Sequence, residues 1–535
     1  MREESSAAKG MFILSFAGIM AKVMSVVYTP FLREILGLEG YGVYSKTTEV
    51  FLFIYALSCM GAQPAVAKVV AEYTALKDNK AAVKTFKIAS RFYGFLGIIL
   101  GIFMFSLAAP LSLIANSERA ALGIKALAPC IIVTSLLAVC RGFMQGKNDM
   151  TSIAVSQILE QFLNVIISLL CAFILVQSSL ELGNAGAQIG TTVGALFACF
   201  YIIYCYEKKR YGDVIFTDET ASKVRNKEIL TRLLRYSIPI TVSAGLQNFG
   251  GIVDMINVSS RLAYAGFDKD QADALYGLLG QYRTIYGVPL VIITAIGTTV
   301  LPTLAKLIVL KERKEAKKKI SYAFKMAFMI SVPATVGLSV LSNEVYIALF
   351  NDGYGSDIMK YGSIILVLMS ITQIQSTVLQ GINKMYYVLG SFCVGIIAKI
   401  IVNYIFVGIP SINIYGAIIG NCVWHLIPGI INHRKICSVM KMRMPILRLS
   451  IRPIIASMGM ALVIYICKQP LDFLYRFIPL TRITAMPITV VLVCIGAFVY
   501  LYIMIAIGGI RKRDIELISP KILKLIPRFM RIKLK

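Results

Sequence analysis

Long apolar stretches recur along almost the whole chain, and they restrict the possible fold more than any other feature. Windows of about 20 predominantly apolar residues, the length that a helix needs to cross the hydrocarbon core of a bilayer, follow one another from residue 10 to residue 508. Hydrophobic residues make up 57% of the sequence and charged residues only 16%. Nothing long and polar interrupts the series, so the pattern predicts a polytopic membrane protein.

We predict fourteen membrane spans. No stretch shows the two-residue alternation of a membrane barrel strand, and in lipid the backbone must satisfy its own hydrogen bonds, so we expect helices. The predicted fold class is therefore all-α. The predicted spans are residues 10–30, 43–63, 92–115, 122–143, 150–176, 184–206, 236–260, 274–304, 321–342, 360–380, 385–408, 413–432, 450–467 and 483–508.

Positive charge is concentrated in alternate loops. The net charge is +27, and the basic clusters follow spans two, six, eight, twelve and fourteen, whereas the odd-numbered loops are short and neutral or acidic. The positive-inside bias therefore predicts that both termini are cytoplasmic. We interpret the clusters as loop residues beside anionic lipid headgroups, and we expect no nucleic-acid binding because there is no soluble module to carry it.

The sequence suggests no cofactor or metal site. Its eleven cysteines lie mostly inside spans without a Cys-x-x-Cys pair, and its only histidines are His425 and His433. A metal centre or a histidine-based catalytic triad is therefore not expected. A Gly-x4-Gly-Lys-Ser/Thr nucleotide-binding loop is also absent from the sequence.

Two segments of the chain resemble each other. Gln-Gly-x-Asn precedes a span in residues 144–172 and again in residues 379–407, and each span is followed by a similar helix, "NAGAQIG" (184–190) or "IYGAIIG" (414–420). The copies are about 230–235 residues apart, close to six helices. Six is even, so the second copy enters the membrane in the same direction as the first. The alternative is chance similarity between apolar helices.

The duplication predicts two parallel-repeat six-helix bundles, with two additional helices at the C-terminal end. The cleft between such bundles is the natural substrate path of an alternating-access carrier. The predicted parts are an N-terminal bundle (1–210), a cytoplasmic linker (211–235), a C-terminal bundle (236–435), two further transmembrane helices (436–510) and a basic cytoplasmic tail (511–535).

Several polar side chains fall at membrane depth, where a charge costs on the order of 3 kcal/mol on insertion scales and so needs a wet cavity or a partner. For Lys46, Glu49 and Arg235, which are near span ends, we favour snorkelling or an ion pair within one helix. The complete set is Lys22, Lys46, Glu49, Glu160, Arg235, Gln247, Asn248, Asp254, Arg283, Lys399 and Asn403.

Arg283 and Asp254 have the most informative positions. Arg283 lies about nine residues into its predicted span, beside Tyr282, and its planar fork of donors matches phosphate or carboxylate geometry. We expect it to bind an anionic headgroup, and the alternative is a buried pair with an acid such as Glu160. Asp254 is an isolated carboxylate flanked by amides, suited to a monovalent cation or a proton, or else to capping a neighbouring helix.

Residues 9–73, residues 275–306 and the Gln-Gly-x-Asn helix pairs resemble the multidrug/oligosaccharidyl-lipid/polysaccharide (MOP) exporter superfamily. The similar branch contains polysaccharide biosynthesis proteins, among them stage V sporulation protein B and MurJ-like lipid II flippases of Gram-positive bacteria. The resemblance covers essentially the whole chain. It implies a MATE-like fold of fourteen helices, a bacterial plasma-membrane location, and a role in peptidoglycan or other polysaccharide biosynthesis, in growth or in sporulation.

The resemblance also implies residue roles. Arg283 matches the family arginine that precedes the proline of span eight and faces the central cavity. Asp254 and Asn403 resemble sodium-site residues of lipid II flippases, although Val407 stands where those proteins have a second acid. Residues 28–30 read "YTP" where many relatives carry an arginine before Ile-Pro, so precursors other than lipid II stay open.

We therefore expect a flippase that moves a polyprenyl-diphosphate-linked saccharide from the inner to the outer leaflet by alternating access, with no bond broken and no cofactor. An inside-negative potential favours outward movement of an anion by about 2.3 kcal/mol per charge per 100 mV, and a monovalent cation is the other candidate for coupling. The predicted substrate-binding residues are Arg283, Lys22, Tyr282, Gln247 and Asn248, and the predicted coupling-ion residues are Asp254 and Asn403.

Two other classes of function fit the sequence less well. A MATE-type multidrug cation antiporter of the same superfamily should bind cations through acids in its first bundle, where this sequence offers Lys22 and few deep acids besides Glu160. A membrane-embedded glycosyl-polymerising enzyme should carry paired carboxylates on a large outer loop, and every predicted outer loop here is short.

Overall fold

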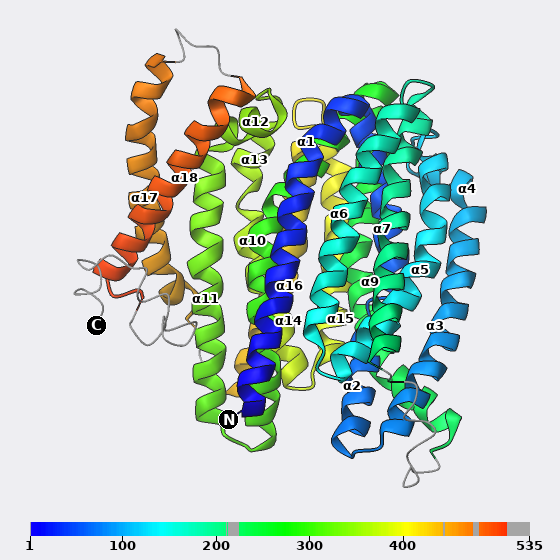
Figure 1. Cartoon of the computed structure of the whole chain (residues 1–535). Coiled ribbons are helices and arrows are strands. Elements are labelled where there is room, and N and C mark those ends of the chain that lie inside the picture. The colour runs from blue at the N-terminus through cyan, green and yellow to red at the C-terminus, as the bar shows by residue number, and fades with distance from the viewer. Residues whose placement is uncertain (1, 210, 212–223, 442–444, 475–480, 511–535) are drawn as a thin grey trace. The chain divides into compact units, whose positions relative to one another are not determined.

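A computed structural model describes residues 2–209, 211, 224–441, 445–474 and 481–510 (Figure 1). Every regular element in these ranges is a helix, which confirms the predicted all-α class. The predicted basic tail (511–535) and residues 212–223 of the predicted linker lie outside the described residues. The helices are α1 (Arg2–Ser58), α2 (Ala62–Ala75), α3 (Asn79–Ser106), α4 (Ala108–Ile114), α5 (Ala120–Gly146), α6 (Met150–Leu175), α7 (Leu180–Lys208), α9 (Asn226–Tyr264), α10 (Lys269–Val309), α11 (Arg313–Val340), α12 (Ser342–Phe350), α13 (Ser356–Gly362), α14 (Ile365–Gly381), α15 (Met385–Val407), α16 (Tyr415–Met440), α17 (Ile446–Leu474) and α18 (Arg482–Ala506).

Ten helical stretches in the described ranges are long and apolar enough to cross a membrane, and the bent pair α13–α14 would make an eleventh. The chain is thus a polytopic membrane protein. Eleven is three fewer than the fourteen predicted spans. The stretch Ile13–Ala75 takes in the first two predicted spans, and neither α9 nor α16 is apolar enough to meet the same criterion. Buried polar side chains such as Asp254 in α9 and Asn421 in α16 reduce their apolar character.

The long helix α1 is bent at a glycine. Gly37 has φ 72° and ψ 174°, a conformation that is open almost only to glycine because a side chain there would clash with the backbone. Helical residues continue directly on both sides of it. The loop predicted between the first two spans is therefore a single bend, which brings the second half of α1 alongside α9.

The helices group into two compact units, Met1–Val288 with Val388–Trp424, and Pro289–Tyr387 with His425–Lys535. In the first unit α6 packs along α7, and α5 packs against α3 and α7. In the second unit α17 packs on α11 and on α18. The division runs through α10 and α16, so the units do not coincide with the predicted bundles, and the two six-helix bundles stay a prediction.

The two Gln-Gly-x-Asn segments form the same turn. Asn148 and Asn383 both adopt the left-handed conformation, with φ 65° and 58°, which asparagine tolerates better than most residues. In each turn the next residue's N–H donates to the carbonyl oxygen five residues earlier, at 2.8 and 2.7 Å, as in a Schellman motif. The motif therefore ends α5 and α14 in the same way.

The helix pairs that follow these turns pack through glycines at matching positions. A Cβ added to Gly190 of α7 would lie 2.2 Å from the Ser168 hydroxyl of α6, and one added to Gly420 of α16 would lie 1.8 Å from the Asn403 amide of α15. Both pairs of helices can approach this closely only because the glycines have no side chain. This repetition of packing supports an internal duplication.

Candidate functional site

A polar cavity of about 410 Å³ lies in the first unit, between α1, α6, α7 and α10. Two of the predicted substrate-binding residues, Arg283 and Lys22, line it. Most of the remaining wall consists of aromatic, amide and hydroxyl side chains. These include Tyr28, Tyr41, Tyr44, Ser45, Thr48, Gln161, Asn164, Gln188, Thr191 and Thr284.

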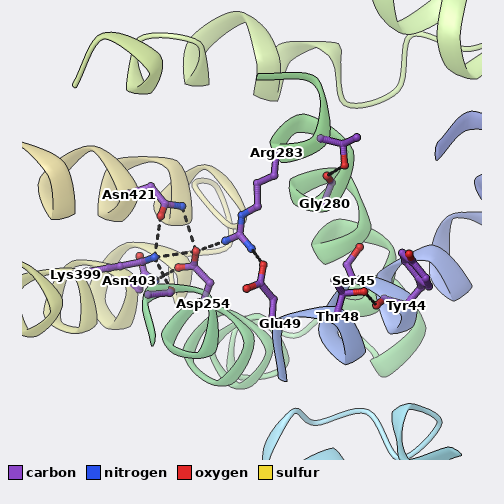
Figure 2. Close-up of polar contacts among 12 residues, drawn as sticks. Tyr44, Ser45, Thr48, Glu49, Asp254, Gly280, Arg283, Lys399, Asn403 and Asn421 are labelled. Carbon is purple, nitrogen blue, oxygen red and sulfur yellow. Dashed lines mark hydrogen bonds and ion pairs between the residues drawn. The ribbon is translucent and has the colours of Figure 1, made fainter. Parts of the chain in front are cut away.

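The guanidinium group of Arg283 bridges two carboxylates, Glu49 of α1 and Asp254 of α9, as Figure 2 shows. Its side chain is still 19% exposed, so it reaches the cavity while both ends of its fork are paired. A buried pair with an acid was the sequence-based alternative for this arginine. The acid named for it was wrong, because Glu160 pairs instead with Arg141, at 2.6 Å.

Asp254 is the centre of a larger polar network. One carboxylate oxygen accepts from the Asn403 amide at 2.8 Å, and the other meets Lys399 at 2.9 Å, Asn421 at 3.2 Å and Arg283 (Figure 2). Asp254, Lys399 and Asn403 are all fully buried. The network thus ties α9 to α10, α15 and α16, and a buried charge needs such partners. It brings the predicted pair Asp254 and Asn403 together.

Lys22 of α1 contributes the uncompensated charge of the cavity. A Cβ on Gly287 would come within 2.4 Å of its Cε atom, so the Lys22 side chain extends toward α10. Within the part of the chain that the structure describes, no acid pairs with it. The cavity wall therefore carries a net positive charge next to the paired Arg283.

The other predicted substrate-binding residues do not line this cavity. Tyr282 is 2% exposed and packs edge-on against Tyr286. Gln247 and Asn248 hydrogen-bond back into their own helix, each to the residue four positions earlier. The structure does not bring these three side chains together with Arg283 at one surface.

The expectation for Lys46 and Glu49 was wrong. Lys46 is fully buried and forms an ion pair with Asp273 of α10, and Glu49 pairs with Arg283. The reason is that α10 packs against this part of α1, where a Cβ on Gly42 would meet the Asp273 backbone, so both side chains find their partners on α10 and not within α1. Arg235 is exposed.

Sequence reasoning missed the residues that α6 and α7 contribute to the cavity. Gln161 and Asn164 are three residues apart on α6, and Gln188 and Thr191 are three apart on α7. Residues at this spacing lie on the same face of a helix. That pattern of polar residues within apolar spans was the signal that could have identified this wall of the cavity.

A sequence profile of the family described as "Polysaccharide biosynthesis protein" matches residues 7–308, more than half of the chain. Stage V sporulation protein B of Bacillus subtilis (strain 168) is 24% identical over 76% of this chain and 79% of its own length. The lipid II flippase MurJ of the same organism is 24% identical over 95% of this chain and 96% of its own length.

Solved structures share the fold. Lipid II flippase MurJ in an inward closed conformation superposes with a TM-score of 0.67 at 15% identity, covering 92% of this chain and 98% of that one. The inward-facing conformation of a multidrug resistance MATE family transporter of the MOP superfamily gives 0.65 at 20% identity, covering 78% and 95%. At these identities the likeness concerns the fold alone.

Proposed function

Because this chain belongs to the polysaccharide biosynthesis protein family of the MOP superfamily, and is therefore a transporter rather than an enzyme, we propose that it is a flippase. Its substrate is a polyprenyl-diphosphate-linked saccharide, a lipid II-like precursor, which it carries from the inner to the outer leaflet by alternating access. The observation that carries this proposal is the polar cavity with an unpaired lysine, Lys22, and a partly exposed arginine, Arg283, in its wall.

The cavity suits a charged saccharide headgroup. Its volume of about 410 Å³ falls in the range of small-molecule sites, roughly 300–1,000 Å³. Amides and hydroxyls can both donate to and accept from sugar hydroxyls, and tyrosine offers a flat apolar face with a polar tip. Tyr28, Tyr41 and Tyr44 of α1, together with Gln161 of α6 and Gln188 of α7, supply both kinds of contact.

Lys22 and Arg283 supply the contacts for the diphosphate. Lys22 needs no rearrangement, since no acid in the described residues holds it. Arg283 would exchange Glu49, which also lines the cavity, for phosphate oxygens, because both present the planar acceptors that its fork matches. Glu49 thus holds the arginine in place until a diphosphate competes for it.

The second unit, taken by itself, contains an apolar cavity whose lining suits a hydrocarbon chain. It has a volume of about 420 Å³ and is lined by residues of α11, α12, α17 and α18 and by Pro289 of α10. Its lining consists almost entirely of aliphatic and small residues, including Pro333, Gly337, Met460, Gly496 and Leu501. Such a surface binds hydrocarbon without leaving polar groups unsatisfied.

The proposal includes the finer architecture expected from the sequence. We propose fourteen spans in two parallel six-helix bundles with two additional helices, and cytoplasmic termini in the bacterial plasma membrane. The repeated turns at Asn148 and Asn383 support the duplication, and the alternation of basic loops supports the orientation. A cation antiporter is less well supported, because Glu49, Asp254 and Glu160 are each already paired with an arginine.

The test is complementation of a bacterium depleted of its resident lipid II flippase. The intact chain should restore growth and surface exposure of lipid II, and Lys22→Gln should lose most of that activity. A charge-assisted hydrogen bond contributes about 1.5–3 kcal/mol, which corresponds to roughly 10- to 100-fold in affinity. Lys22→Arg, which keeps the charge, should retain function, and Arg235→Gln is the matched control at an exposed position of α9.

Three outcomes decide the proposal. Failure of the intact chain at normal membrane levels would redirect it to another polyprenyl-linked precursor, tested in the same way in strains blocked in teichoic-acid or capsule export. Loss with Arg283→Ala in protein that reaches the membrane would place the diphosphate at this wall. Full activity of both Lys22→Gln and Arg283→Ala would refute the assigned site.

A further inference from the structure

The ammonium group of Lys399 is enclosed by oxygen atoms. Its Nζ lies 2.9 Å from an Asp254 carboxylate oxygen, 2.8 Å from the Asn421 amide oxygen and 2.7 Å from the Gly250 carbonyl oxygen. The ring of Trp424 covers it, with the ring centroid 4.5 Å from Nζ. The Lys399 side chain has no exposed surface.

These three oxygens are of the kinds that bind hard metal cations, namely a carboxylate, a side-chain amide and a backbone carbonyl. The neighbouring Asn403 side chain donates to the other Asp254 oxygen at 2.8 Å, and its own amide oxygen is buried and accepts no hydrogen bond from any described residue. Intramembrane cation sites in carriers use the same donors. The ammonium group therefore sits in a ring of oxygens that would otherwise suit a monovalent cation.

The charges of the network already balance. Glu49 and Asp254 provide two negative charges, and Arg283 and Lys399 provide two positive ones. A free cation entering this buried network would add an uncompensated charge, which is costly where water is excluded. Unlike a soluble ion, the lysine cannot leave between transport cycles, since it is covalently attached to α15.

We propose that Lys399 is a built-in counter-ion that takes the place of a soluble coupling cation, so that this carrier works without sodium. The part that concerns transport rests on the proposed flippase function, whereas the part that concerns cation binding does not. The sequence-based prediction of Asp254 and Asn403 as coupling-ion residues is thereby refined: Asp254 binds the Lys399 ammonium group, and Asn403 donates to the other oxygen of that carboxylate.

The proposal predicts that removing the ammonium group creates a sodium site. Methionine is unbranched and fills much of the space of the lysine stem, but it leaves the oxygens of Asp254, Asn421 and Gly250 without their shared donor. Purified full-length Lys399→Met in detergent should melt at a higher temperature as sodium chloride replaces choline chloride at constant ionic strength. It should also bind radioactive sodium, and Lys399→Met/Asp254→Asn should do neither.

Sodium binding by the wild-type protein is measured first, because this result does not depend on whether the variants fold. Its melting temperature should be the same in sodium and in choline, and it should bind no radioactive sodium specifically. Specific sodium binding by the wild type that Asp254→Asn abolishes would overturn the proposal, and so would a folded Lys399→Met that ignores sodium. If Lys399→Met does not fold, Lys399→Gln replaces it in the same comparison.

These measurements need no transport substrate, so they separate this inference from the proposed function. If complementation fails but Lys399→Met gains a sodium site, only the substrate assignment is lost. If complementation succeeds, growth of the rescued strain should be equal in sodium and potassium media of matched ionic strength, relative to the same strain with its resident flippase. A requirement for sodium specific to the rescued strain would contradict the built-in counter-ion.

Discussion

Removal of either partner of the buried Lys46–Asp273 ion pair should destabilise the protein strongly. Both side chains are almost completely enclosed, at 0% and 4% exposure. Lys46 also donates to the Ala115 carbonyl at 3.0 Å, and Ser117 donates to Asp273 at 3.0 Å. Asp273→Leu would leave the ammonium group with one neutral acceptor, and Lys46→Met would leave the carboxylate with one hydroxyl.

The expected magnitude follows from that enclosure. Breaking a buried pair by removing one partner costs about 3–5 kcal/mol, whereas replacing both partners by apolar residues of similar volume is often neutral. Each single variant should therefore lose several kcal/mol of unfolding free energy, and Lys46→Met/Asp273→Leu should recover most of that loss. The difference between the double variant and the sum of the two single variants measures the coupling energy.

The assay is unfolding of the purified protein in mixed micelles titrated with sodium dodecyl sulfate, for the wild type, both single variants and the double variant. Lys318→Met is the control, because Lys318 and Glu315 form an exposed pair at 65% and 52% exposure and such pairs contribute at most about 1 kcal/mol. Single-variant losses no larger than this control, or losses that simply add in the double variant, would refute the reasoning.

Two further predictions concern packing and pH. Gly42→Ala should lower the yield of monodisperse protein in size-exclusion chromatography, because its Cβ would lie 1.8 Å from the Asp273 backbone oxygen, whereas Gly390→Ala, with nothing within 4 Å, should behave as wild type. Burial tends to raise the pKa of the Asp149 carboxyl, but hydrogen bonds from Lys209 and from α6 outweigh it and lower that pKa below its usual 3.8. Asp149 therefore stabilises the fold above about pH 4 and loses this effect as the pH falls through the lowered pKa. Melting temperatures between pH 6 and pH 3 should consequently fall less for Asp149→Asn than for wild type, and parallel curves would count against the assignment.

The sequence predicted the helical fold well because apolar length is a local property. It predicted the joint between the first two spans poorly, since a bend at one glycine, Gly37, looks the same in the sequence as the end of a helix. In the spans that correspond to α9 and α16, the sequence could not show how the polar residues are satisfied. Their polar residues meet one another only in the folded protein, so the sequence alone does not reveal that Asp254 and Asn421 satisfy each other.

The depth of Arg283 indicated a charge that needs either a substrate headgroup or a buried acid, but depth does not identify which acid. Glu160 was a reasonable candidate as an acid inside a span, yet it lies beside Arg141, which is 19 residues away in the chain. Glu49 is 234 residues from Arg283. Pairings of this range depend on which helix faces meet, and that information is distributed over the packing of several helices.

The arrangement of cations explains how Arg283 could leave its acids during the proposed cycle. If it were the only partner of Asp254, transfer of its guanidinium group to a diphosphate would strand a buried carboxylate, at a cost of several kcal/mol. Lys399, Asn403 and Asn421 remain bonded to that carboxylate, so Asp254 stays satisfied when the arginine moves. Only Glu49 loses its partner, and Glu49 lines the polar cavity, where its charge can be solvated. In the proposed cycle, a permanently held lysine behind a movable arginine would therefore allow the arginine to bind substrate reversibly.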